Sequence, residues 1–166
     1  MVESVGPRFR ADERMTSATV HASAVLVGAR AVLIRGASGA GKSRLAFELL
    51  DAAPDGRLRF ARLVGDDRVH LESANGRLLV RPAQPLAGLI ELRGVGLLRR
   101  DYEPCAVVGW VVDLDAADAQ RLPEQQTFEL HGIKLPRLAL ARGAAPLPAV
   151  IALITSMGAA SAPHTA

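Results

Sequence analysis

Hydrophobic and polar positions divide the middle of this chain into short apolar runs, and most of these runs are too short for helices. Loose alternation over residues 19–27 predicts a strand, and the apolar run 31–34 predicts a short buried strand. Apolar residues recur at helical spacing over 43–53, and Pro54 and Gly56 end this predicted helix. The first unit is therefore strand, glycine-rich loop and helix.

The rest of the body is richer in strands than in helices. Residues 69–72 and 77–80 flank Asn75-Gly76, which predicts a hairpin because both residues tolerate positive φ. We expect a helical turn over 116–121 and a closing helix over 147–157. Short strands are expected at 62–64, 89–92 and 126–130, and a central strand at 106–114.

These elements predict an α/β fold with a strand-rich mixed sheet, a helix after the glycine-rich loop and a closing C-terminal helix. The length of 166 residues fits one domain, which we place at 16–158. Residues 1–15 are charged and aperiodic and predict a flexible leader, whereas 159–166 predict a disordered tail.

Charge argues against nucleic acid as a partner. Lys and Arg number 20 and Asp and Glu 17, so the net charge is only +3 despite a pI near 9.7. The basic residues are scattered along the chain, without the stripe that a nucleic-acid surface requires. Lysine is rare, since Lys42 and Lys134 are the only two.

Cysteine usage and apolar runs bear on the compartment. Cys105 is the only cysteine, which excludes an intrachain disulfide and fits a reducing compartment. The charged N-terminus lacks a signal-peptide pattern, and no apolar run is long enough to span a membrane. We therefore expect a cytoplasmic protein.

The segment GASGAGKS fits the phosphate-binding pattern G-x-x-x-x-G-K-[ST]. Glycines allow positive φ and a close approach of backbone N–H groups to phosphate, at the positive end of the following helix. Lys42 supplies a charge for the β- and γ-phosphates, and the Ser43 hydroxyl is a hard ligand for Mg²⁺. The predicted nucleotide site consists of Gly36, Ala37, Ser38, Gly39, Ala40, Gly41, Lys42 and Ser43.

Three further positions carry candidate chemistry, each with a structural alternative. Asp66 and Asp67 follow an apolar run, where a carboxylate would meet the metal of a phosphate-loop enzyme, although a surface turn also fits. Glu91 and Arg93 are expected on one face of a strand, either at a metal or as an edge ion pair. His21 precedes a strand, where a structural role is the alternative.

Taken in order, these residues resemble the catalytic domain of bacterial HPr kinase/phosphorylase. In that family a His opens the strand before the phosphate-binding loop, Ala-Asp-Asp follows the loop, and E-[IL]-R-G-[LV]-G comes later. This chain has His21, GASGAGKS, Gly65-Asp66-Asp67 and the segment ELRGVG at 91–96, and the resemblance covers residues 18–115.

The resemblance implies a kinase that transfers phosphate from ATP to a serine of the phosphocarrier HPr, and in many members phosphorolysis as well. It implies a fold akin to phosphoenolpyruvate carboxykinase and rings of six subunits. Asp67 would exchange the proton of the acceptor serine, beside Asp66 and tuned by His21. Mg²⁺ would bind Ser43 and Glu91, with Asp66 as a further candidate ligand, and Arg93, Gly94 and Gly96 would line the site.

The chain also departs from the family pattern. Arg44 replaces the acidic residue that commonly follows the loop serine, and Gly65 replaces Ala. The C-terminal segment 135–154 only faintly matches the family's arginine loop and docking helix, with Arg137 as the candidate for its first arginine. The chain begins almost at the catalytic domain, as in the short alphaproteobacterial forms.

Two other function classes remain open from sequence. An ATP-binding regulatory sensor would signal by a change in its loops without transferring phosphate. A small-molecule kinase would need an arginine-rich lid, for which Arg99-Arg100 is the candidate.

Overall fold

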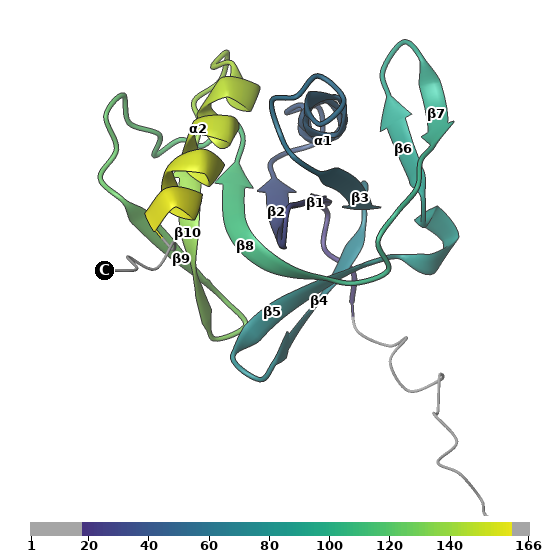
Figure 1. Cartoon of the computed structure of the whole chain (residues 1–166), viewed down its shortest axis with the longest axis horizontal. Helices are drawn as coiled ribbons and strands as arrows, with labels where there is room; N and C mark the ends of the chain where they lie inside the picture. Colours follow the sequence, from purple (N-terminus) through teal and green to yellow (C-terminus); the bar gives the residue numbers. More distant parts are fainter. Residues whose placement is uncertain (1–17, 161–166) are drawn as a thin grey trace, which may run out of the picture.

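A mixed sheet of eight strands forms the frame of the protein (Figure 1). The computed structural model of the chain describes residues 18–160, so the predicted leader 1–15 lies outside the described residues, as does most of the predicted tail. The sheet contains β1 (Ser23–Val27), β2 (Arg30–Arg35), β3 (Ala61–Gly65), β4 (Val69–Ala74), β5 (Arg77–Pro82), β8 (Ala106–Asp113), β9 (Gln126–Leu130) and β10 (Ile133–Ala139).

The strands run in the order β3-β1-β2-β8-β10-β9, and β5 joins β4 to the side of β8. Pairing is parallel between β2 and β8 and between β8 and β10, and antiparallel elsewhere. The carboxyl ends of these three parallel strands therefore meet at one edge, where ligands of open α/β sheets commonly bind.

Two helices, α1 (Lys42–Ala52) and α2 (Pro146–Ala160), cover one face of the sheet (Figure 1). Leu45 and Leu49 of α1 and Val150 of α2 are buried in one cluster with alternate residues of β2 and β8. The intervening residues of these strands pack on the other face, against β4 and β5. Burial on both faces explains the continuous apolar runs of β2 and β8.

A second, two-stranded sheet stands beside α1, formed by β6 (Leu89–Leu92) and β7 (Gly96–Arg99) after a short 3₁₀ turn at Gln84–Leu86 (Figure 1). Ile90 pairs with Leu98, and both pack on the core next to α1. The hairpin is therefore anchored on one side and free on the other, where Val95 and Leu97 are exposed.

Most predicted elements are present, with corrections. The strand predicted over 19–27 begins at Ser23, with an isolated bridge from Val20 to Val69 before it. Residues 116–121 form no helix but a single turn, in which the Ala119 N–H donates to the Ala116 carbonyl, and the Ala116 N–H donates to the carbonyl of Leu140, just after β10. Helix α2 runs to Ala160, so the predicted tail starts too early.

Two strands escaped prediction. Strand β7 is only four residues long and begins at the second glycine of Gly94-Val95-Gly96. Strand β10 contains Pro136, which argues against a central strand. Pro136 is accommodated because β10 pairs with β8 only from Arg137 onward, so one side of Pro136 has no strand partner.

Side chains of opposite charge meet on the sheet face away from the helices. Asp113 accepts hydrogen bonds from Arg35 Nε and Nη2, both at 2.7 Å, and from Arg137 Nε at 2.6 Å. Arg137 also binds the carboxylate of Asp118, and the Arg35 guanidinium lies 4.2 Å from the centroid of the Phe128 ring. This cluster fastens the loop after β8 and the end of β10 to the last residue of β2.

The same cluster holds Arg137 away from the helix-covered face. Arg137 alternates with Leu138, which packs on the side of the helices, and shares its side with Leu135. The pKa of Arg137 is raised by its hydrogen bond to Asp118 and further by Asp113, against the effect of burial. Arg137 thus belongs to an ion cluster outside the cleft, and the catalytic role considered from sequence stays a prediction.

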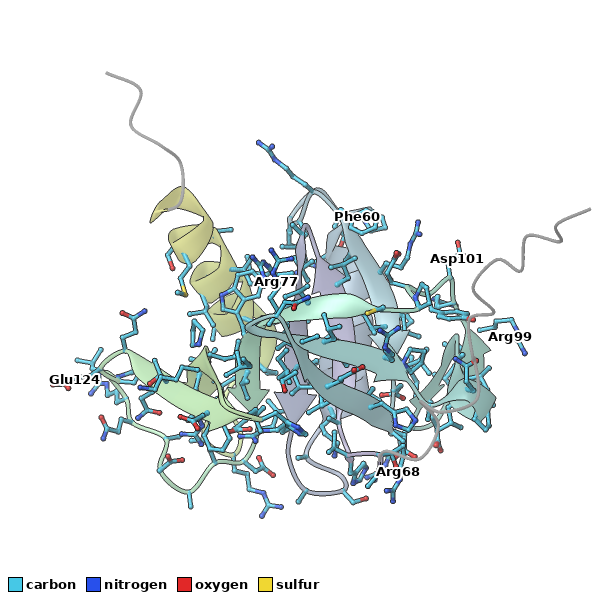
Figure 2. The ribbon with its side chains drawn as sticks, turned by 90° about the horizontal axis from the view of Figure 1, so that it is seen from below. Phe60, Arg68, Arg77, Arg99, Asp101 and Glu124 are labelled. Carbon is cyan, nitrogen blue, oxygen red and sulfur yellow. The ribbon has the colours of Figure 1, made fainter. Side chains whose placement is uncertain are left out.

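Two further features concern nucleic acid and membranes as possible partners: the distribution of arginines on the surface and the length of the helices. Arg68, Arg77 and Arg99 lie at separate places on the surface (Figure 2). Within the described part of the chain, no helix combines the length and the apolarity needed to cross a bilayer.

We predict that Asp113→Asn destabilises the protein at pH 7 by about 2 kcal/mol, because it leaves two partly buried arginines without their shared carboxylate. Burial raises the pKa of Asp113, but the hydrogen bonds and charges of Arg35 and Arg137 outweigh burial and hold this pKa below its ordinary 3.8. The carboxylate therefore stabilises the fold above about pH 4, and this stabilisation disappears as the pH falls through the lowered pKa.

Urea unfolding at pH 7 and at pH 3 measures this effect. The gap between Asp113→Asn and wild type should narrow at pH 3, and Asp118→Asn, at the exposed end of the cluster, should have a much smaller effect. A gap that stays constant from pH 7 to pH 3 would contradict the assignment of the stabilisation to the ionised carboxylate.

Candidate functional site

A cleft of about 1400 Å³ opens at the carboxyl edge of the parallel strands, beside the start of α1. The phosphate-binding loop, the aspartate pair, the turn of the β6–β7 hairpin and the segment before α2 line it. Segments from four parts of the chain therefore converge on one opening.

The loop after β2 has the backbone of an anion site. Gly36 and Gly41 adopt φ values of 154° and 100°, which residues with a side chain rarely tolerate. A Cβ on Gly36 would also lie only 3.1 Å from that of Ala40. Helix α1 starts after Gly41 without a side-chain cap or an acidic residue in its first turn, and this end of the helix lines the cleft, so no side chain of the turn neutralises its positive end.

Lys42 is buried beneath this loop. Its Nζ donates to the carbonyl oxygens of Gly36 at 2.8 Å and Ala37 at 3.0 Å. Burial lowers the pKa of Lys42 below its ordinary 10.5, although the negative charges of Asp67 and Asp66 act in the opposite direction. An amine held this way can transfer its hydrogen bonds to phosphate oxygens when a nucleotide enters.

Asp66 lies at the base of the cleft, directly after β3, and is only 3% exposed. It accepts hydrogen bonds from Ser23 Oγ at 2.6 Å, from Ser43 Oγ at 2.8 and 2.9 Å, and from the backbone N–H of Glu91 at 3.1 Å. These donors are all neutral. A buried carboxylate without a cationic contact is costly, which fits a site that gains a metal ion with its substrate.

Asp67 is the exposed member of the pair. Its φ of 63° turns its side chain away from that of Asp66, and its side chain is 61% exposed. His21 Nε2 lies 3.0 Å from Asp67 Oδ1, so the residue two positions before β1 orients this carboxylate from the side. The adjacent aspartates therefore occupy different environments, one facing Ser43 and the other facing solvent.

The donor set fits Mg²⁺, a hard cation that prefers oxygen. The Ser43 hydroxyl and the carboxylates of Asp66 and Glu91 all line the cleft, and these residues would hold the ion. Over residues 18–160 no group of three His, Cys, Asp or Glu side chains is preassembled for a metal. Further oxygen ligands would therefore come from phosphate and water, as Mg²⁺ commonly requires.

The hairpin turn supplies the other side of the cleft. Strand β6 ends at Leu92, so Arg93 belongs to the turn and does not share a strand face with Glu91 as predicted. Gly94 and Gly96 have φ values of 83° and 110° and shape this turn. Arg93 lines the cleft, whereas Arg137 does not.

Sequence reasoning missed two parts of the site. Ser23 is fully buried and bonded to Asp66, and nothing in its apolar surroundings distinguishes it from a strand residue. The segment before α2 and the start of α2 line the cleft, at Leu140, Ala141 and 143–148. Gly143 and Pro146 between a strand and a helix were the available signal for this second segment.

Gly65 has a steric reason for replacing the family's alanine. A Cβ on Gly65 would lie 2.7 Å from Val69 Cγ1 and 3.3 Å from Pro82 Cα. The Val69 side chain therefore occupies the space that a side chain at position 65, directly before the aspartate pair, would need.

Several known proteins resemble the chain. The family of the HPr Serine kinase C-terminal domain matches residues 13–101. HPr kinase/phosphorylase of Streptococcus thermophilus is 33% identical over 137 residues, which cover 72% of this chain and 41% of that protein. HPr kinase/phosphorylase of Lactococcus lactis subsp. lactis is 40% identical over 89 residues, covering 52% of this chain and 26% of that protein.

A solved structure supports the fold. The Hpr(Ser) kinase/phosphatase from Coxiella burnetii superposes with a TM-score of 0.72 at 22% identity, covering 87% of this chain and 98% of that chain. The predicted fold class is confirmed by this likeness. The aligned parts span less than half the length of the curated relatives. Because the family match extends over more than half of the 166 residues, this chain belongs to the HPr serine kinase C-terminal domain family.

Proposed function

We propose that this protein is an ATP- and Mg²⁺-dependent serine kinase whose acceptor is an HPr-type phosphocarrier protein. The observation that carries the proposal is the difference in environment between Asp66 and Asp67 beside the phosphate-binding loop. Asp66 is buried against Ser43, whereas Asp67 is exposed at the mouth of the same cleft and paired with His21. A protein that only binds nucleotide has no need of the second carboxylate.

On the nucleotide side, the chain contributes position and charge. The N–H groups of the loop and of the first turn of α1 bind phosphate oxygens, and Lys42 turns its amine from loop carbonyls to the β- and γ-phosphates. Mg²⁺, when bound, would neutralise part of the phosphate charge. Ser43, Asp66 and Glu91 would hold the ion, and Ser23 keeps the Asp66 carboxylate in place.

On the acceptor side, Asp67 is the base. It accepts the proton of the serine hydroxyl as the new O–P bond forms and the bond to the leaving ADP breaks. His21 orients the Asp67 carboxylate through their 3.0 Å contact. The exposure of Asp67 supports a large acceptor, because a serine on a folded protein must reach this carboxylate from solvent.

Other aspects of the family remain predictions for this chain. These are phosphorolysis of the phosphorylated carrier, assembly into rings of six and a cytoplasmic location. The candidate lid of a small-molecule kinase gains no support, because neither Arg99 nor Arg100 lines the cleft. Arg100 instead lies over the Phe47 ring, 5.3 Å from its centroid.

We predict that the pure protein transfers label from γ-labelled ATP to a serine of the HPr-type carrier encoded in the same genome, when Mg²⁺ is present. Asp67→Asn should slow the transfer about 100-fold or more, because the acceptor loses its base while ATP binding persists. Phosphoserine analysis of the carrier and direct ATP binding measure the two effects.

Asp101→Asn is the matched control for this experiment, since it makes the same chemical change at an exposed position outside the cleft. Label retained in Asp67→Asn would refute the role of Asp67. Tight ATP binding by wild type without label on the carrier would refute the proposed acceptor.

Lys42→Met gives a second test. We predict that this change abolishes ATP binding while leaving the nucleotide-free protein at least as stable at pH 7, by up to about 1 kcal/mol, because a buried charge is replaced by an apolar chain. Because the pKa of Lys42 is lower in the folded state, wild-type stability should gain from this residue as pH rises from the lowered pKa towards 10.5.

Thermal unfolding without nucleotide, from pH 7 to pH 10, measures both points. The variant should lack the part of the pH dependence that Lys42 contributes. A strongly destabilised Lys42→Met would show that the amine serves the fold rather than the nucleotide.

A further inference from the structure

The turn of the β6–β7 hairpin brings Arg93 back over the phosphate-binding loop. Its Nη2 atom lies 3.7 Å from the point that a Cβ on Gly39 would occupy. Arg93 is exposed, and it lines the cleft together with Lys42 and Ser43. The guanidinium therefore stands at the phosphate end of the cleft.

The other basic side chains of the cleft are already engaged. Arg44 Nε lies 3.0 Å from Glu48, and Arg57 Nη2 lies 3.0 Å from Asp55. The amine of Lys42 donates to two loop carbonyls. Within residues 18–160, Arg93 is the cleft arginine with no hydrogen bond or ion pair to another residue.

An unengaged guanidinium at this place has a specific electrostatic use. The terminal phosphoryl group of ATP would enter a cleft lined by Asp66 and Glu91, which would hold Mg²⁺, and by Asp67, the proposed base for the acceptor. Negative charge on both the phosphate and the carboxylates opposes close approach unless a cation lies between them. A planar guanidinium suits this task, because it donates two parallel hydrogen bonds to phosphate oxygens and keeps its charge.

We propose that Arg93 is a catalytic residue that binds the γ-phosphate of ATP and stabilises its charge during transfer. The proposal rests on the proposed function of the site. In the transfer, the bond between the γ-phosphorus and the bridging oxygen breaks, the serine Oγ–P bond forms, and Asp67 receives the serine proton. Arg93 keeps all its protons and contributes hydrogen bonds and charge alone.

The attachment of the hairpin explains how Arg93 is positioned. The backbone N–H of Glu91 donates to Asp66 Oδ2, and the β6–β7 pair is otherwise separate from the main sheet. Asp66 therefore fixes Ser43 on one side and the base of the hairpin on the other. Arg93 follows Glu91 by two residues, so the carboxylate that faces the metal side also sets the distance of the arginine from the loop.

The test compares nucleotides that differ by the γ-phosphate. Binding of ADP and of the non-hydrolysable β,γ-imido analogue of ATP, both with Mg²⁺, is measured for wild type, Arg93→Ala, Arg93→Lys and Arg99→Ala. Arg99→Ala is the matched control, because Arg99 is on the same hairpin but outside the cleft and projects away from the fold (Figure 2).

Arg93→Ala should weaken binding of the triphosphate analogue about tenfold, with ADP affinity unchanged within about twofold. The kcat of transfer to the carrier should fall about 100-fold, more than KM for ATP rises. The reason is that Arg93 mainly stabilises the charge of the phosphoryl group during its transfer. Arg93→Lys should restore part of the binding and little of the kcat, and added guanidinium ion should partly rescue Arg93→Ala.

The outcomes separate this proposal from the one on which it rests. Equal weakening of ADP and the analogue, or unchanged kcat in Arg93→Ala, would overturn the role of Arg93 and leave the kinase assignment intact. Selective loss of the triphosphate analogue would support Arg93 even if the HPr-type carrier proved to be the wrong acceptor. A wild-type protein that binds neither nucleotide would overturn both.

Discussion

The arrangement of the cleft depends on one buried carboxylate. Asp66 receives hydrogen bonds from a strand serine, from the hydroxyl at the start of α1 and from the backbone of the β6–β7 hairpin. These three donors come from segments far apart in the sequence, and the carboxylate is almost completely removed from water. Neutral donors orient it without cancelling its charge, so it remains available for a cation.

The neighbouring aspartate shows how one residue of separation produces a different chemical role. Positive φ at Asp67 directs its side chain outward, where His21 orients it and solvent reaches it. In our proposal the inner carboxylate belongs to the nucleotide and the outer one to the acceptor. The β6–β7 hairpin adds a cation at the phosphate end of the site, because its turn carries Arg93 over the loop.

Sequence alone predicted the parts of the site in which residue type and function are tightly coupled. The glycine, lysine and serine positions of the loop are constrained by backbone geometry and phosphate chemistry, so their pattern is readable without a structure. The apolar spacing of α1 and the Asn-Gly turn between β4 and β5 are equally local signals, and both are present.

The rest depended on contacts between distant segments. Ser23 has no local mark, and only its 2.6 Å bond to Asp66 reveals its place. Arg137 was considered for catalysis, but its two aspartate partners lie in other segments that the sequence does not connect to it. Strand β10 was missed because Pro136 disfavours a strand. The sheet accommodates Pro136 because β10 pairs with β8 only from Arg137 onward.

The uncapped start of α1 links the stability of the protein to the presence of an anion at that end of the helix. Its first turn contains Arg44 and no acidic residue, so the positive end of the helix lacks a compensating charge until an anion arrives. In our proposal a bound nucleotide would complete the helix as a capping side chain does, and each tenfold excess over its dissociation constant would add about 1.4 kcal/mol to the free energy of unfolding. The resistance of the protein to proteolysis would thus rise with the concentration of any nucleotide whose phosphates occupy this loop.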